Sequence, residues 1–291
     1  MITPELLAQV RRLTIRSRRA VEEVFSGAYR SAFRGQGLEF AEVREYVPGD
    51  DIRSIDWNVT ARAGRPFVKR FDEERELTVI VALDLSGSLS FGSRARAKRD
   101  AAAEAGALLA LAAARNRDRV GLLLFTDRIE LYLPPGKSRA RALRIARELL
   151  AFEPAGRGTD LAGALGFLNR VLRRRAIVFL VSDWRAAAFD RPLAHLARRH
   201  DVVALDVADP LERDLPAGGL LRVRDLETGR TGWVDASSRA ARGAWKGALA
   251  RRAKELDQTF RRAGVPRLAL DADRPAAPIL IRYFERRAAA R

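Results

Sequence analysis

The sequence predicts an α/β fold, a doubly wound and mostly parallel sheet of Rossmann-like type, because buried strands alternate with helices along most of the chain. Three apolar and β-branched runs at 77–83, 120–125 and 176–181 are typical of strands covered on both faces. Segments with apolar residues at helical spacing follow these runs after short loops. Alternation of this kind favours parallel strands joined by crossover helices.

The chain after residue 76 is expected to form this sheet and its helices. Ser138 is a candidate helix cap, and the segment 129–133 suits a hairpin partner for the strand before it. The expected helices span 96–114, 138–150, 160–173, 191–199, 238–263 and 279–291, and the further strands span 202–207, 220–223, 231–234 and 267–270.

The chain before residue 76 predicts an N-terminal helix and a small β-containing module. This module is mildly acidic within a strongly basic chain, which sets it apart from the sheet domain. Its expected elements are a helix over 4–25, a turn at 48–51 and short strands over 55–61 and 66–71. We therefore divide the chain into the N-terminal helix and module over 1–75, a sheet domain over 76–272, and a C-terminal helix or tail over 273–291.

The composition is that of a basic globular protein. A formal net charge of +17 makes an anionic partner one interpretation and an ordinary solvated surface the other. The lack of cysteine excludes disulfides, zinc thiolate sites and thiol catalysis. The longest apolar run, 105–114, is shorter than the roughly 18 residues that a membrane helix needs. We expect a cytoplasmic protein.

Three polar clusters follow predicted strands or begin predicted helices. Asp84, Ser86 and Ser88 come directly after the first buried strand, Thr159 precedes a helix, and Asp183 follows the third buried strand. In doubly wound folds, ligands bind beyond the carboxyl ends of the strands. Each residue alone is more simply explained as a helix cap or turn residue. Their conjunction predicts a single site.

The donor atoms in these clusters are hard oxygens, from two carboxylates and three hydroxyls. Such donors select a hard cation, which is Mg²⁺ or, alternatively, Mn²⁺ or Ca²⁺. Few carboxylates would leave the ion electrophilic, so an acidic side chain of a partner protein could complete its coordination. The sequence therefore favours a metal site that binds protein.

The run Asp84-x-Ser86-x-Ser88, with Thr159 and Asp183 downstream, resembles the metal-ion-dependent adhesion site (MIDAS) of von Willebrand factor A-type (vWA) domains. The resemblance implies that the two serines and the threonine contact the metal directly. It implies that the two aspartates act from the second layer or through water.

A second resemblance lies upstream, in the runs 35–39, 43–46, 48–51, 53–57, 61–62 and 68–69. These resemble the bacterial domain-of-unknown-function fifty-eight family. The resemblance implies association with a MoxR-type AAA+ ATPase, and hence a role in assembling or remodelling a protein complex.

Dense opposite charges surround a tryptophan in the same upstream region. We interpret them as a structural module, a buried ion-pair network that fixes this region to the sheet domain, with a docking surface as the alternative. The residues of this module are Asp50, Asp51, Arg53, Asp56, Trp57 and Arg62.

Two other classes of function are alternatives to metal-dependent binding. A metal-dependent phosphatase or hydrolase could use the aspartates, but Ser86 stands where a dehalogenase-type phosphatase needs its second carboxylate. The hydrolase elbow and the Walker motif are both missing from the sequence. A basic nucleic-acid-binding protein is permitted by the charge, although no zinc-finger or RNA-recognition motif is visible. We expect no enzyme.

Overall fold

The computed structural model describes residues 28–29, 32–33, 39–72, 76–213, 215–216 and 218–290. The helix expected over 4–25 lies outside these residues. Within the described part of the chain, no helix is long and apolar enough to span a membrane.

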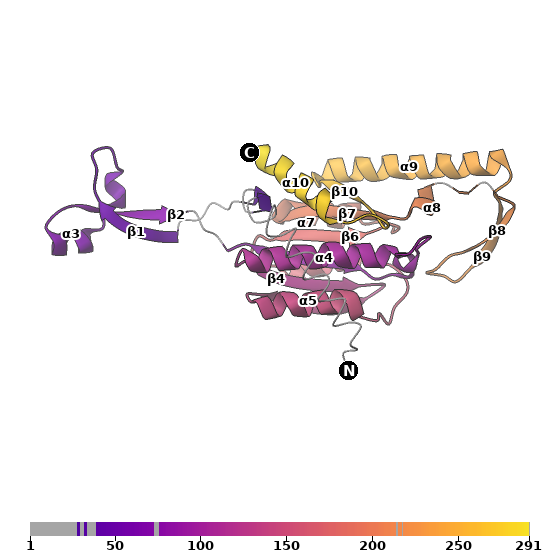
Figure 1. The fold of residues 1–291 in the computed structure, drawn as a ribbon, viewed down its shortest axis with the longest axis horizontal. Helices are drawn as coiled ribbons and strands as arrows, with labels where there is room; N and C mark the ends of the chain where they lie inside the picture. Colours follow the sequence, from indigo (N-terminus) through magenta and orange to yellow (C-terminus); the bar gives the residue numbers. More distant parts are fainter. Residues whose placement is uncertain are drawn as a thin grey trace.

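A six-stranded sheet forms the centre of the molecule (Figure 1), with the order β10-β7-β6-β3-β4-β5. All neighbouring strands run parallel except β5, which pairs antiparallel with β4. The predicted α/β, mostly parallel fold is therefore confirmed. The strands are β3 (Thr78–Asp84), β4 (Arg119–Phe125), β5 (Ile129–Gly136), β6 (Ile177–Ser182), β7 (Asp201–Ala208) and β10 (Arg267–Asp271).

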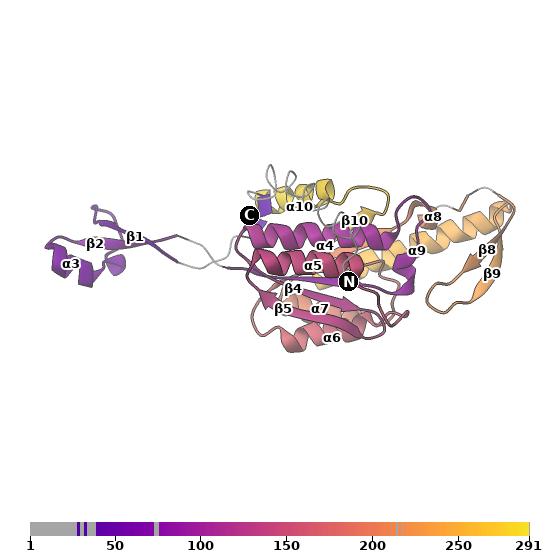
Figure 2. The ribbon, with the colours of Figure 1, turned by 60° about the horizontal axis from the view of Figure 1, so that its bottom comes forward.

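Helices cover both faces of the sheet. Figure 2 shows α4 and α5 on one side of strands β4 and β5, with α6 and α7 on the other. The long helix α9 packs with α7, and α10 lies on the face of α4. The helices are α4 (Lys98–Arg115), α5 (Arg139–Ala151), α6 (Leu161–Val171), α7 (Asp190–Arg199), α8 (Pro210–Arg213), α9 (Arg239–Ala263) and α10 (Ala277–Ala289).

Strand β6 shows why its sequence is apolar throughout. Side chains alternate between the two faces of a strand. Phe179 and Val181 accordingly join the apolar cluster under α4 and α10, whereas Val178 and Leu180 join the cluster under α6 and α7. A strand covered on both faces must be apolar at every position.

The last helix, α10, packs directly on the sheet. The Phe284 ring meets Phe33 at 5.5 Å and Phe179 at 6.3 Å between ring centroids. Arg287 of the same helix forms an ion pair with Asp201 at the start of β7. The segment that the sequence sets apart as a terminal helix or tail thus contributes Phe284 to the main core. The domain boundaries themselves stay a prediction.

The upstream module consists of a two-stranded antiparallel sheet, β1 (Glu39–Glu45) with β2 (Phe67–Asp72), and a helix α3 (Trp57–Ala63) after a 3-10 turn η2 (Ile52–Ser54). The strand expected over 55–61 is wrong. Asp56 accepts hydrogen bonds from two backbone N–H groups in the first turn of α3, and Gly64 ends the helix in the left-handed region. The caps at both ends favour a helix over the strand that the β-branched residues of this segment predict.

The predicted ion-pair module also needs correction, because its carboxylates mainly shape the backbone. Asp50 does form a salt bridge, but with Arg44, and its carboxylate also accepts the Val47 N–H. Asp51 caps the N-terminus of η2, and Asp56 caps the N-terminus of α3. The other three residues of the expected network, Arg53, Trp57 and Arg62, are exposed.

This exposure contradicts a buried network around the tryptophan, since 67% of Trp57 is accessible to solvent. A surface aromatic of this kind leaves the alternative, a docking surface, open.

Candidate metal centre

The predicted site lies at the carboxyl ends of adjacent strands. β3 ends at Asp84 and β6 ends at Ser182, and these strands are neighbours in the sheet. The Ser182 hydroxyl donates a hydrogen bond to Asp84 Oδ2 at 2.7 Å, which links the two strand ends directly. The parallel register thus brings the first and third polar clusters to one edge.

Asp84 is wholly buried and accepts hydrogen bonds at both carboxylate oxygens. The backbone N–H of Ser86 donates to Oδ1 at 2.8 Å. Burial raises the pKa of Asp84 to about 6, and the nearby charge of Asp183 raises that pKa as well. A buried carboxylate with a raised pKa is a group that a cation would stabilise.

The two serines of the predicted site lie next to each other. Ser86 Oγ and Ser88 Oγ are 3.1 Å apart, in the turn that leads into the short 3-10 helix η3 (Gly87–Ser90). The structure therefore brings Asp84, Ser86 and Ser88 into direct contact, as the sequence predicts.

The loop that carries Thr159 lies against this turn. The Gly87 N–H donates to the Arg157 carbonyl oxygen at 2.8 Å. Glu130 of β5 holds the same loop from the other side, since its carboxylate accepts the Gly156 N–H at 2.7 Å. Thr159 therefore lies two residues after Arg157, whose carbonyl oxygen binds the turn that carries Ser86 and Ser88.

Two residues that the sequence analysis missed engage the remaining predicted ligands. The Thr159 hydroxyl lies 3.0 Å from Glu227 Oε1, in the loop between β8 (Leu220–Arg224) and β9 (Thr231–Asp235). The Asp183 Oδ2 atom lies 2.7 Å from Lys98 Nζ, a side chain with no exposed surface.

The environment of Asp183 favours an indirect role in metal binding. Its second oxygen, Oδ1, accepts the Arg185 N–H at 3.2 Å, so both oxygens already have partners. Lys98 Nζ also contacts Glu212 at 2.8 Å and compensates two carboxylates at once. One sequence signal pointed to Lys98: a lysine that begins a helix opposes the helix dipole and needs an acidic partner.

The oxygens of this site fit a small divalent cation. Ligands on adjacent corners of an Mg²⁺ octahedron, each about 2.1 Å from the ion, are separated by about 3 Å. The Ser86–Ser88 and Thr159–Glu227 oxygen pairs have this spacing, 3.1 and 3.0 Å. Among the described residues, no group of three or more His, Cys, Asp or Glu side chains could hold a metal. A metal here depends on hydroxyl ligands.

A protein family described as "Protein of unknown function DUF58" matches residues 42–255 of the chain. The chain belongs to the DUF58 family. An uncharacterized protein of Mycobacterium bovis is 32% identical to this DUF58 protein over 289 residues, which cover 98% of this chain and 90% of that relative. An uncharacterized protein of Mycobacterium tuberculosis H37Rv aligns equally well. The family predicted from the upstream motifs is confirmed.

Solved structures with a similar chain path include vWA-type domains. BatB from Bacteroides thetaiotaomicron aligns with a TM-score of 0.49 and 18% identity, over 73% of this chain and 99% of that one. The SpRpn10 vWA domain aligns with a TM-score of 0.39 and 8% identity, over 71% and 94%. Proximal thread matrix protein 1 from the mussel byssus, with a zinc-occupied MIDAS motif, aligns with a TM-score of 0.37 and 16% identity, over 46% and 39%.

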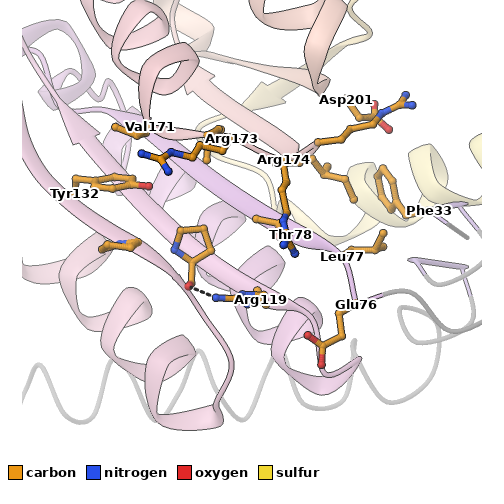
Figure 3. Close-up of a pocket in the computed structure, with 16 residues that line it drawn as sticks. Phe33, Glu76, Leu77, Thr78, Arg119, Tyr132, Val171, Arg173, Arg174 and Asp201 are labelled. Carbon is orange, nitrogen blue, oxygen red and sulfur yellow. Dashed lines mark hydrogen bonds between the residues drawn. The ribbon is translucent and has the colours of Figure 1, made fainter. Parts of the chain in front are cut away.

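The DUF58 chain has a hollow at the opposite, amino-terminal edge of the sheet (Figure 3). Its two described acidic residues are already paired, Glu76 with Lys137 and Asp201 with Arg287. The hollow is therefore positive, and none of the predicted ligands lines it. Its exposed basic side chains are Arg119, Arg173, Arg174 and Arg175.

Proposed function

We propose that this protein is a metal-dependent protein-binding module, in which the hydroxyls of Ser86, Ser88 and Thr159 hold Mg²⁺ and the carboxylates of Asp84 and Asp183 act indirectly beside them. Mn²⁺ or Ca²⁺ are the alternative ions for the same oxygen donors. The observation that carries the proposal is the pair of serine hydroxyls 3.1 Å apart beside a buried carboxylate. When bound, the ion supplies an electrophilic position for an acidic side chain of another protein.

Each residue has a separate part in this site. The hydroxyls of Ser86, Ser88 and Thr159 supply neutral oxygen ligands. Asp84 orients the serine turn through the Ser86 N–H and supplies the nearby negative charge. Asp183, held by Lys98, adds charge without direct contact.

Binding is favoured over catalysis because the site carboxylates are committed. Asp84 has no exposed surface and accepts hydrogen bonds at both oxygens, so it cannot reach a substrate as a nucleophile. Both oxygens of Asp183 already have partners, Oδ2 with Lys98 and Oδ1 with the Arg185 N–H, so neither is free to act on a substrate. These facts argue against the phosphatase or hydrolase alternative.

The partner in this proposal is an AAA+ ATPase of the MoxR type, in the cytoplasm, acting in assembly or remodelling of a protein complex. Membership in the DUF58 family supports this partner through the resemblance drawn from the sequence. A carboxylate of the partner or of its client would bind the metal.

Metal binding is tested by thermal unfolding with Mg²⁺, Mn²⁺ and a chelator. A ligand at a hundred times its dissociation constant stabilises the folded state by about 2.7 kcal/mol. We expect this gain in the wild type and its loss in Ser86→Ala. Ser90→Ala is the matched control, because Ser90 is an exposed serine in the same 3-10 helix. Equal gains in all three proteins would refute the proposed site.

Partner binding is tested by capture of a purified MoxR-type ATPase on the immobilised protein. We expect capture in Mg²⁺ that is lost on chelation and in Ser86→Ala but kept in Ser90→Ala. Capture that does not respond to the chelator would contradict a metal-mediated contact while leaving the metal site itself intact.

A further inference from the structure

The loop between β8 and β9 reaches the metal site from a distant part of the chain. Figure 1 shows this hairpin beyond the carboxyl ends of the central strands, beside α9. Its tip contacts both site loops: Glu227 meets Thr159, and the Leu226 carbonyl oxygen lies against Gly87. A Cβ atom on residue 87 would overlap that carbonyl oxygen, so glycine permits the approach.

Hydrogen bonds within the hairpin define the shape of its tip. The Asp225 carboxylate accepts the Glu227 N–H at 2.9 Å and the Thr228 hydroxyl at 2.6 Å. The Asp225 N–H donates to the Arg230 carbonyl oxygen at 2.8 Å, which closes the loop. This bonding holds the backbone of Glu227 while its side chain extends to Thr159.

The rest of the hairpin has little apolar contact with the body of the protein. Most residues of β8 and β9 are exposed, including Leu220 at 63% and Trp233 at 65%. Segments with few buried apolar contacts open at a low cost in free energy. The hairpin can therefore leave the site without unfolding the sheet.

We propose that Glu227 is the chain's own carboxylate ligand for the metal, and that it competes with the acidic side chain of a partner. This inference rests on the proposed function. Glu227 Oε1 lies 3.0 Å from Thr159 Oγ1, the spacing of adjacent ligands around one Mg²⁺ ion. The hairpin then acts as an internal substitute that a partner displaces.

The chemistry of the tip supports this role over a simple hydrogen bond. A threonine hydroxyl needs only one acceptor, and a neutral side chain or water would serve. A carboxylate adds a full negative charge beside a site whose other two carboxylates, Asp84 and Asp183, already have hydrogen-bond partners. The charge benefits a bound cation, whereas without a cation it adds repulsion.

The first experiment measures Mn²⁺ and Mg²⁺ affinity of the full chain by calorimetric titration. Glu227→Gln keeps the size and an acceptor for Thr159 but removes the charge. We expect it to weaken metal binding by roughly ten- to a hundredfold, the range seen when groups around a metal are altered. Glu255→Gln, which removes the same charge from an exposed position of α9, should bind as the wild type does.

The second experiment measures amide hydrogen exchange in the hairpin tip, residues 225–230. Mg²⁺ should slow exchange there in the wild type but not in Glu227→Gln. Added acetate, as a simple carboxylate, should speed exchange at the tip of the metal-loaded wild type by competing for the ion.

The outcomes separate this inference from the proposed function. Metal binding in the wild type, with unchanged affinity in Glu227→Gln and no metal-dependent protection of the tip, overturns the role of Glu227 alone. A wild type that binds neither ion overturns both. Loss of affinity in Glu227→Gln together with loss of tip protection supports the internal ligand.

Discussion

The two edges of the central sheet carry opposite kinds of polar site. At the carboxyl edge, Asp84 and Lys98 are buried, and each has fixed partners within hydrogen-bond distance. At the amino edge, Arg173 and Arg174 are exposed around an open hollow. The comparison indicates that the burial of a charged side chain, more than its sign, decides how much the side chain contributes to stability.

The difference has a topological cause. The residues that follow β3 and β6 meet at the carboxyl ends of these parallel strands, as Lys98 and Asp183 do. The α5–α6 loop and the β8–β9 hairpin reach the same edge and bring Thr159 and Glu227 together there. The amino ends receive chain from the helices, and the arginines at 173–175 there face solvent. We therefore expect substitution of the buried groups at the carboxyl edge to lower stability more than substitution of the exposed groups at the amino edge.

The largest expected effect is the loss of the buried ion pair at the carboxyl edge. Lys98→Met leaves the Asp183 carboxylate without its cation, and breaking a buried pair destabilises a protein by about 3–5 kcal/mol. Urea denaturation measures the loss. Lys137→Met removes the exposed amino-edge pair with Glu76 and should cost about 0–1 kcal/mol. Similar losses in both variants would erase the contrast between the edges.

The second effect concerns the contact between the serine turn and the hairpin. Gly87→Ala places a methyl group on the Leu226 carbonyl oxygen, and overpacking of this kind costs about 1–3 kcal/mol unless the hairpin moves away. Thermal unfolding and limited proteolysis of the hairpin distinguish the two responses. Gly243→Ala, at an exposed position in the second turn of α9, meets no atom within 4 Å and should be neutral or slightly stabilising. No change in stability or cleavage for Gly87→Ala would contradict the close approach.

The third effect is a pH dependence at the amino edge. Burial raises the pKa of Asp118 from its ordinary 3.8 to about 6, although its carboxylate accepts the Leu77 N–H. The folded state thus holds a proton that the unfolded state has released, so stability falls as pH rises from about 4 to 6. Asp118 is only 4% exposed, and we expect the change between pH 4 and 7 to be on the order of 1–3 kcal/mol. Asp118→Asn should flatten this slope in urea titrations at pH 4 and 7, and an unchanged slope would exclude Asp118 as its source.

The smallest effect is expected among the exposed arginines. Arg174→Ala should change stability by less than about 0.5 kcal/mol and leave metal affinity unchanged. Inorganic phosphate should bind weakly to the arginines at the amino edge of the wild type, and added salt should weaken this binding by screening the charges. Titration calorimetry at low and high salt measures both points. A change in metal affinity would show that the two edges are coupled.

The local sequence could predict much of the sheet and the candidate ligands. Residues 77–83 and 176–181 form β3 and β6 as expected, because a strand buried on both faces must be apolar at each position. Asp84, Ser86 and Ser88 were found because they follow a strand end directly. The error over 55–61 arose where Asp56 and Gly64 cap a helix in a segment rich in β-branched residues.

By itself, then, the sequence determined the order of strands and helices and the oxygen chemistry at the strand ends, since both are written in residues close together along the chain. Only the tertiary structure decided that Lys98 neutralises Asp183 and that Glu227 meets Thr159. These pairs are separated by 85 and 68 residues, and no periodicity or local motif relates side chains so far apart. Lys98 and Asp183 meet because they follow β3 and β6, parallel neighbours whose carboxyl ends lie at one edge. Thr159 and Glu227 meet because the α5–α6 loop and the β8–β9 hairpin fold over that same edge.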